Sequence, residues 1–351
     1  MTSSPTTRTN LPTRVLITGG AGFIGSHLAE ALLERDHQVT IIDDLSTGRF
    51  ENIAHLTGHP RFRFAIESIT NSAVMDRLVS ECTLIFHLAA AVGVKLIVDQ
   101  PVHTIRTNIM GTEAVLNTAL RYRAKVLVAS TSEVYGKGNA IPFSEDDDVV
   151  LGPTSRSRWA YAASKMVDEF LALAFHRERD LPVVVFRLFN TVGPRQTGRY
   201  GMVIPRLVQQ ALQGEPLTVY GDGQQSRCFL HVQDAVEAIL ALSECPQAVG
   251  QVFNVGSVDE ITILELARTI LAQAAQRGAT ATTHDQGERI VFVPYDQAYA
   301  EGFDDMRRRV PDISRLRALT GWQPTRSLSS ILKDILDHYL QSNEHESGFH
   351  T

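Results

Sequence analysis

The sequence predicts an α/β fold with a doubly wound parallel sheet and a smaller C-terminal α/β lobe. Apolar, β-rich segments alternate with amphipathic helical segments over about the first 190 residues. The turn after the first of these strands is rich in glycine. Beyond that region the strands shorten, and proline and glycine become frequent. The alternation implies right-handed βαβ crossovers, and therefore a parallel sheet with helices on both faces.

The expected elements follow this alternation in order. The strands of the sheet are predicted at residues 14–18, 38–43, 62–66, 83–87, 125–130 and 182–187. The helices between them are predicted at about 22–35, 71–79, 101–121 and 158–178. The later part is predicted to hold short strands at 217–219, 227–231 and 251–253 and helices near 203–213, 232–244, 262–276 and 327–340.

These elements predict two domains. A Rossmann-type domain is expected over residues 13–190, with segments at about 225–255 returning to it. The lobe is expected mainly over residues 191–340. Residues 1–12 and 342–351 are expected to be flexible tails, because chain ends are rarely tied down.

The first strand-to-helix turn predicts a dinucleotide site. An apolar run at 15–17 ends in glycines at positions 19, 20, 22 and 25, and an amphipathic segment follows. Such a turn lets backbone N–H groups and the positive end of a helix approach a pyrophosphate. Gly19 would make the turn, Gly22 would admit the phosphates, and Gly25 would let the helix pack on the strand. Glycine-rich turns also occur without a ligand, but three glycines at this spacing favour one.

An acidic residue follows at the expected place. The second apolar run ends in Asp43, eighteen residues after Gly25. A carboxylate there can accept hydrogen bonds from both hydroxyls of the adenosine ribose, and it would repel a 2′-phosphate. NAD is therefore expected rather than NADP, although Arg49 lies nearby and works against that preference.

Composition excludes several classes of protein. The chain has 351 residues, of which 44% are hydrophobic and 21% charged, and a net charge of −6. This balance gives no reason to expect nucleic acid or an anionic membrane as a partner. No apolar run approaches the roughly 20 residues needed to span a bilayer, and residues 1–10 lack the apolar core of a secretory signal. Three separated cysteines, Cys82, Cys228 and Cys245, predict no metal site and no disulfide, and favour a reducing cytoplasm.

Catalytic chemistry is indicated by Tyr161 and Lys165. Four residues apart on a helix, they project from the same face. The ammonium would lower the pKa of the phenol, and the phenolate could take a proton from a hydroxyl while hydride leaves the adjacent carbon. Pairs of this kind also arise by chance on exposed helices. Here, however, Thr131, Ser132 and Glu133 follow the fifth strand at the carboxyl edge of the sheet, where ligands bind.

Together these segments resemble an extended short-chain dehydrogenase/reductase of the nucleotide-sugar epimerase, dehydratase and decarboxylase group. The matching segments occur in family order over most of residues 14–315, at 18–25, 43–45, 87–90, 107–112, 132–136, 161–165, 189–195, 219–223, 227 and 234. The resemblance implies a bound NAD and a nucleotide-sugar substrate, and it implies neither a metal ion nor a nucleic-acid partner.

The resemblance also implies which residues contact NAD. They are Gly19, Gly22, Phe23, Ile24, Gly25, Asp43, Ser68, Ile69, Leu88, Ala89, Ala90, Asn108, Tyr161 and Lys165. One position departs from the family pattern. Relatives usually carry Asp-Ile where this chain has Ser68 and Ile69, so recognition of the adenine is expected to be weaker or to use another residue.

For the substrate, the resemblance implies a second set of contacts. They are Lys95, Asn190, Val203, Tyr220, Arg227, Arg308 and Arg309. Arg227 would grip the diphosphate, and Arg308 or Arg309 would supply the second arginine of the lobe, because guanidinium groups suit phosphate and carboxylate oxygens. A solvated charged face is the alternative for the run at 307–309. Tyr161, Lys165, Thr131, Ser132 and Glu133 are implied as the catalytic group.

The reaction is left among three outcomes that share oxidation of C4 of the sugar. The segments 131–136 and 308–313 resemble those of UDP-glucuronate decarboxylases, in which an arginine contacts the substrate carboxylate, so decarboxylation is favoured. The loop at 91–99 does not look like the decarboxylase loop. The alternatives are 4-epimerisation of a UDP-hexose or UDP-hexuronate, and a dehydration in which Glu133 removes the C5 proton.

Two further expectations follow from the resemblance. A catalytically inactive, dinucleotide-binding sensor is a remote alternative, because such chains typically lack the tyrosine or the lysine that this chain keeps. The helices at 101–121 and 158–178 match the pair that forms a four-helix interface in relatives, so a homodimer is expected.

Overall fold

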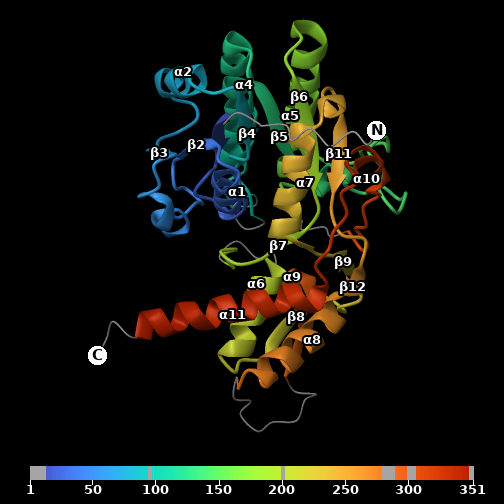
Figure 1. Cartoon of the computed structure of the whole chain (residues 1–351). Helices are drawn as coiled ribbons and strands as arrows, with labels where there is room; N and C mark the ends of the chain where they lie inside the picture. Colours follow the sequence, from blue (N-terminus) through green and yellow to red (C-terminus); the bar gives the residue numbers. More distant parts are fainter. Residues whose placement is uncertain are drawn as a thin grey trace, which may run out of the picture.

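The computed structural model describes residues 13–347 apart from 94–96, 98, 199–201, 279–288 and 299–305. A seven-stranded sheet forms its centre, in the order β11-β6-β5-β4-β1-β2-β3, and every pair of neighbouring strands is parallel. The strands are β1 (Arg14–Thr18), β2 (Gln38–Asp43), β3 (Phe62–Ile66), β4 (Leu84–His87), β5 (Lys125–Thr131), β6 (Val183–Leu188) and β11 (Val252–Val255). The prediction of a doubly wound parallel sheet is confirmed (Figure 1).

Helices cover both faces of this sheet. One apolar layer joins the sheet to α1 (Phe23–Glu34) and α7 (Val232–Glu244). The other joins it to α2 (Ser72–Ser80), α4 (Pro101–Tyr122) and α5 (Trp159–Arg179). Successive residues of a strand point to opposite faces, so Val15 and Ile17 enter the first layer and Leu16 the second. Burial on both faces explains why these strands read as unbroken apolar runs.

A third apolar cluster lies beyond the sheet. It is built from α6 (Val203–Leu212), β8 (Leu217–Tyr220), α8 (Ile263–Gln276) and α11 (Leu328–Ser347). Figure 1 shows these elements gathered at one end of the sheet. The chain passes directly from the carboxyl ends of β6 and β11 into this region, so the carboxyl edge of the sheet faces it. Helix α11 continues into the segment for which a flexible tail was predicted.

The remaining elements are short. Three two-stranded pairs join β7 (Thr191–Val192) to β10 (Leu230–His231), β9 (Ser226–Cys228) to β12 (Glu260–Thr262), and β8 to β13 (Ile290–Val293). The short helices are η1 (Phe50–Asn52), η2 (Ala54–Leu56), η3 (Ser132–Tyr135), η4 (Pro246–Ala248), α9 (Tyr295–Ala298) and α10 (Ser314–Thr320). Of these, η3 matters most for the site, because it follows β5 at the carboxyl edge of the sheet.

Membrane-spanning helices and clusters of metal-binding side chains are both absent from the described residues. None of their helices is both long and apolar enough to cross a membrane. Within the same residues, no group of three or more His, Cys, Asp and Glu side chains could hold a metal ion. Cys82, Cys228 and Cys245 are all free.

Candidate active site

The glycine turn between β1 and α1 has the geometry that a pyrophosphate requires. Gly19 has φ +71°, and a Cβ there would lie 2.8 Å from the backbone nitrogen of Ala89. A Cβ on Gly25 would lie 2.2 Å from the carbonyl oxygen of Gly19. Helix α1 begins after Gly22, and no side chain caps its first N–H groups. The helix therefore presents uncapped backbone donors and the positive end of its dipole to a ligand.

Asp43 is held at the rim of this turn. One carboxylate oxygen, Oδ2, accepts a hydrogen bond of 2.9 Å from the backbone N–H of Ala21, and the other, Oδ1, one of 2.9 Å from Leu45. Burial raises the pKa of Asp43, and these two backbone donors oppose that rise. Each carboxylate oxygen has a second lone pair, so the group can still accept from the hydroxyls of a ribose. These features fit NAD.

The other predicted NAD contacts lie along the same edge. The backbone N–H of Ala89 donates to Thr18 Oγ1 at 3.2 Å, which fixes the segment 88–90 beside the glycine turn. Asn108 donates to Ser164 Oγ at 3.0 Å and accepts from the N–H of Ala91 at 2.8 Å, so it ties this segment to α5. The Asn108 side-chain amide therefore holds the segment after β4 against helix α5.

Ser68 and Ile69 follow β3 at the place where relatives usually carry Asp-Ile. Ser68 Oγ hydrogen-bonds with Thr70 Oγ1 at 2.8 Å. The side chain of Ile69 is buried, and a Cβ on Gly111 would approach it to 2.6 Å. Glu67, which sequence reasoning did not single out, accepts a 2.8 Å hydrogen bond from the Ser68 N–H. Glu67 thus places a carboxylate directly after β3, one residue before the position at which relatives usually carry an acid.

Tyr161 lies in a buried, charged environment. Its side chain is only 7% exposed and is hydrogen-bonded to Thr131. Burial raises the pKa of the phenol, as do the negative charges of Glu133 and Asp168, while the Thr131 hydrogen bond and Arg158 lower it. Thr131 also accepts from the N–H of Glu133 at 3.2 Å. The predicted tyrosine and hydroxyl residue are therefore in direct contact.

Lys165 has a partner that the sequence did not reveal. Its Nζ donates to Asp168 Oδ2 at 2.7 Å, and both side chains are buried. The sequence carried one signal for this pair, an acid three residues after the lysine on the same helix. Behind the pair, His87 hydrogen-bonds with Thr18 and Thr112. Burial, followed by the charge of Lys165, lowers the pKa of His87 to about 3, so this imidazole is neutral.

Replacing Asp168 tests how this carboxylate acts on the catalytic pair. Because its negative charge raises the pKa of Tyr161, Asp168→Asn should lower that pKa. Without Asp168 as its ion-pair partner, the positive charge of Lys165 would also lower the pKa of Tyr161. We expect the rising limb of the pH–rate profile for C4 oxidation to move to lower pH by about 1 unit. The measurement is single-turnover formation of NADH from about pH 6 upward.

The matched control is Asp180→Asn, at the exposed end of the same helix. Asp180 has φ 55°, a left-handed conformation that asparagine adopts readily. Its profile should coincide with that of the parent. A shift to higher pH in Asp168→Asn would contradict the charge argument.

Glu133 is surrounded by arginines. It contacts Arg158, and Arg309 Nη1 lies 3.9 Å from its Oε1. Although burial alone raises the pKa of this carboxyl, the charges of Arg158, Arg309 and Arg227 lower it below its usual value. Glu133 is therefore an ionised carboxylate next to Tyr161. Arg158 was missed by sequence reasoning, and its position just before α5 carried no signal for it.

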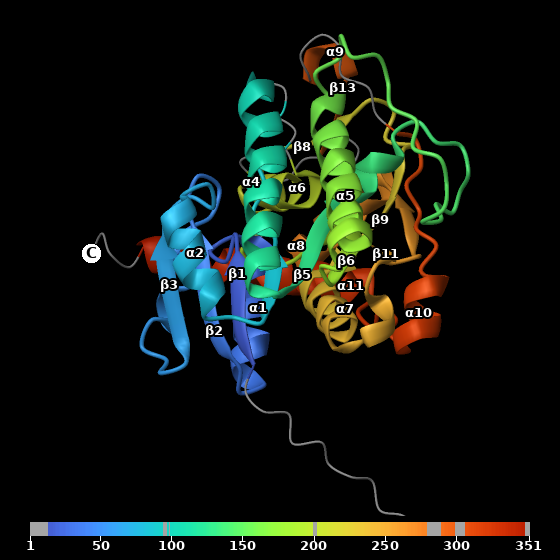
Figure 2. The ribbon, with the colours of Figure 1, turned by 90° about the horizontal axis from the view of Figure 1, so that it is seen from above.

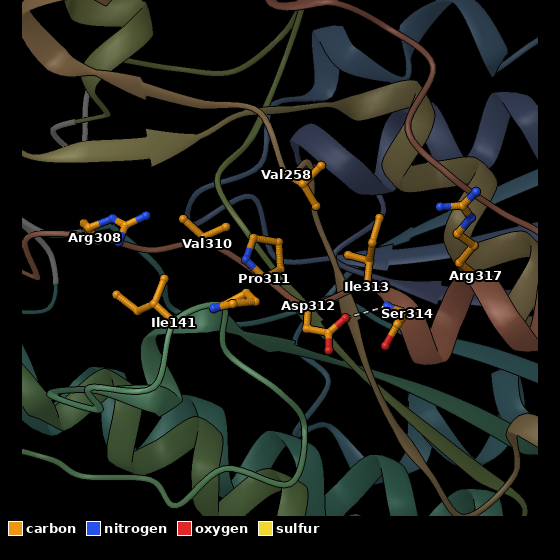
Figure 3. A pocket seen from close by; sticks show the side chains of 10 residues that line it. Ile141, Val258, Arg308, Val310, Pro311, Asp312, Ile313, Ser314 and Arg317 are labelled. Carbon is orange, nitrogen blue, oxygen red and sulfur yellow. Dashed lines mark hydrogen bonds between the residues drawn. The ribbon is translucent and has the colours of Figure 1, made fainter.

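The arginine run at 307–309 divides between the site and the surface. The side chain of Arg309 is 8% exposed, and its Nη1 lies 3.4 Å from Ser132 Oγ. Arg308 is 54% exposed and holds Glu260 through two hydrogen bonds of 2.8 Å. Figure 3 shows Arg308 at the edge of a separate cavity of about 370 Å³, beside Val310. Arg309 thus lies buried beside Ser132 and Glu133, whereas Arg308 belongs to an exposed charged face.

The remaining predicted substrate residues lie on the lobe side. Asn190 Nδ2 donates to the carbonyl of Cys228 at 2.9 Å. Arg227 is buried, and its charge reaches Glu133. The guanidinium of Arg206 lies 3.9 Å from the ring centre of Tyr220. Val203 is the first residue of α6, and Lys95 lies outside the described residues.

Comparison with known proteins gives consistent results. Residues 16–335 match the model of the family described as GDP-mannose 4,6 dehydratase. A UDP-N-acetyl-alpha-D-glucosaminuronate decarboxylase from Bacillus cytotoxicus is 43% identical, over 93% of this chain and 97% of that protein. UDP-glucuronic acid decarboxylase 1 from Danio rerio is 36% identical, over 95% of this chain and 74% of that protein.

Solved structures agree with this result. One is a UDP-glucuronic acid 4-epimerase from Bacillus cereus, determined in complex with UDP-glucuronic acid and NAD. It is 30% identical to this chain with a TM-score of 0.81, and the match covers 93% of this chain and 99% of that one.

Proposed function

Because the chain belongs to the GDP-mannose 4,6-dehydratase family, we propose that it decarboxylates a UDP-linked hexuronate such as UDP-glucuronate. It is an NAD-dependent enzyme that modifies nucleotide sugars. The observation that carries the proposal is the buried guanidinium of Arg309 beside Ser132 and Glu133, close to Tyr161. A C5 carboxylate is the part of a hexuronate that needs such a partner.

The residues of the site can perform this reaction in two stages. In the first, Tyr161 takes the proton of the C4 hydroxyl, and Thr131 orients the phenol through their hydrogen bond. NAD, when bound, supplies the acceptor for the hydride from C4. The C4 carbonyl then lies β to the C5 carboxylate, so the electrons of the breaking C5–C6 bond can pass into that carbonyl. The resulting enolate takes a proton at C5, after which the hydride held by the cofactor would return to C4.

In the second stage Arg309 holds the departing carboxylate. Glu133 stays ionised because Arg158 pairs with it, and its negative charge disfavours a second carboxylate nearby. Loss of neutral CO2 relieves this repulsion. Arg309 thus binds the carboxylate of the uronate, whereas Glu133 favours its loss as CO2.

A 4-epimerase is the second candidate. The likeness to the Bacillus cereus epimerase supports it, since a uronate would occupy the same pocket and keep its carboxylate. Dehydration is less well supported, because Ser132 stands where dehydratases of this group tend to carry an acid.

One experiment separates these reactions. The protein is incubated with UDP-glucuronate, UDP-N-acetylglucosaminuronate and UDP-glucose, and the products are identified by mass and NMR. Decarboxylation predicts loss of the mass of CO2 from one or both uronates and no change in UDP-glucose. A uronate product of unchanged mass with an inverted C4 would support the epimerase, and loss of water would support the dehydratase.

We also propose a division of labour along the chain. Residues 13–190, joined by about 225–255, would bind NAD, and residues 191–340 would mainly bind the nucleotide sugar. The three free cysteines favour the reducing cytoplasm as the place where the enzyme works.

Helices α4 and α5 would form a homodimer interface. They pack side by side, as Figure 2 shows, and they expose Val102 and Phe170 to 69% and 61%. Ile105, Met110 and Val167 add to this apolar surface. Contiguous apolar patches of this kind mark interfaces between proteins.

Phe170→Glu should abolish this dimer, because it places a charge in the centre of an apolar contact. Light scattering should give a mass near 38.7 kDa for the variant and twice that for the parent. The control is Phe292→Glu, a similarly exposed phenylalanine on β13 in the lobe, which should leave the dimer intact. A parent mass near that of the monomer would contradict the proposed interface.

A further inference from the structure

Asn254, a fully buried residue on β11, joins two segments that carry reacting groups. Its Oδ1 accepts a 2.7 Å hydrogen bond from the hydroxyl of Tyr135, which belongs to η3 with Ser132 and Glu133. Its Nδ2 donates to the carbonyl of Asp312 at 3.1 Å, three residues after Arg309. One side-chain amide therefore connects the helix of Glu133 to the segment of Arg309.

A third segment completes this connection. Asn254 Nδ2 also donates to the carbonyl of Phe143 at 2.9 Å. Phe143 is itself paired with the arginine segment, since its N–H donates to Val310 and its carbonyl accepts from the N–H of Asp312, both at 2.8 Å. Three of the four hydrogen bonds that the Asn254 side-chain amide can make go to these three segments, which explains why an asparagine is buried here.

The position of Tyr135 is also fixed. Its ring stacks on Phe143 with 4.7 Å between the ring centres. The guanidinium of Arg187 also lies 4.7 Å from the centre of the Tyr135 ring. Arg187 is in turn held by Glu169 of α5. Tyr135 cannot move without disturbing these contacts, so its hydrogen bond gives Asn254 a rigid reference point.

We propose that Asn254 is a positioning residue, which sets the separation between Arg309 and the Ser132–Glu133 pair. This inference rests on the proposed decarboxylation. Oxidation of C4 uses Tyr161 and Lys165, which Asn254 does not touch, whereas loss of the carboxylate depends on Arg309 and Glu133 together. Asn254 therefore acts on the second stage of the reaction and leaves the first largely unchanged.

The test compares the two stages in the same protein. Formation of NADH in a single turnover reports C4 oxidation, and released CO2 reports decarboxylation. Asn254→Ala should reduce CO2 release by about 100-fold, because a displacement of about 1 Å in a reacting group has that effect. NADH formation, scaled to the folded fraction, should fall by less than about 3-fold, as no contact of Tyr161 or Lys165 is removed.

Two more variants separate positioning from a general loss of stability. Tyr135→Phe removes only the hydroxyl that Asn254 accepts from, so it should lower the ratio of CO2 to NADH in the same direction while keeping the ring contacts. Phe253→Leu changes the neighbouring buried residue on β11, which lies in the apolar layer of α1 and α7. It should destabilise the fold and leave that ratio at the parent value.

The outcomes distinguish the inference from the proposed function. A lower ratio in Asn254→Ala and Tyr135→Phe, with an unchanged ratio in Phe253→Leu, supports the positioning role. An unchanged ratio in both Asn254→Ala and Tyr135→Phe, with a parent that decarboxylates, overturns the role of Asn254 alone. A parent that releases no CO2 from either uronate contradicts the proposed function itself.

Discussion

Tyr161→Phe should lower the rate of C4 oxidation by about 1,000-fold, because it removes the group that takes the proton from the sugar hydroxyl. The phenol is buried and hydrogen-bonded to Thr131, and phenylalanine would keep the ring but have no oxygen to take the proton. The measurement is NADH formation in a single turnover with UDP-glucuronate. Decarboxylation should fall by the same factor, since it follows oxidation.

The control for this variant is Tyr122→Phe at the end of α4. The Tyr122 hydroxyl donates to Asp76 on the surface, and its loss should leave both stages unchanged. Binding of NAD to Tyr161→Phe, measured by fluorescence quenching, should stay close to that of the parent. If Tyr161→Phe matched the parent in turnover, Tyr161 would not be the base and the mechanism above would be wrong.

The main sheet could be predicted because its strands are buried on both faces. Val15, Leu16 and Ile17 are each at most 1% exposed, so they appear in the sequence as one apolar run. A strand at 251–253 was also predicted, and the structure has it as β11 at 252–255, but its neighbour in the sheet was not predicted. Its place beside β6 depends on pairs such as Val252 with Val185, which a local pattern cannot reveal.

The site was predictable where its residues lie close together in the sequence. Tyr161 and Lys165 share a helix face, and Thr131 to Glu133 follow a recognisable strand. Contacts between distant segments were not predictable. Arg158 and Asn254 reach the site or its supports only through the fold.

The arginine run at 307–309 is a second case in which the sequence could not predict which side chain enters the site. Residues 306–313 form no regular helix and almost no strand, so neither a period of two nor one of 3.6 residues applies. Whether Arg308 or Arg309 turns inward is decided by tertiary contacts. One is bound by Glu260 at the surface, and the other lies beside Ser132 and Glu133.

Arg309→Gln should therefore reduce decarboxylation by about 100-fold or more. Removing one partner of a buried, hydrogen-bonded charge pair typically costs about 2–5 kcal/mol, and the substrate carboxylate would lose its guanidinium partner. The loss should be specific to uronates, so binding of UDP-glucose should change little. Turnover of UDP-glucuronate by CO2 release, and binding of both nucleotide sugars by calorimetry, measure the two effects.

Two matched variants serve as controls for this prediction. Arg308→Gln makes the same change at the adjacent residue, and it breaks only an exposed pair with Glu260, worth about 1 kcal/mol or less. Its turnover should stay near that of the parent. Arg309→Lys keeps the positive charge but loses the two-pronged guanidinium, so it should retain part of the activity. Equal losses in Arg308→Gln and Arg309→Gln would show that burial beside Glu133 does not decide which arginine meets the carboxylate.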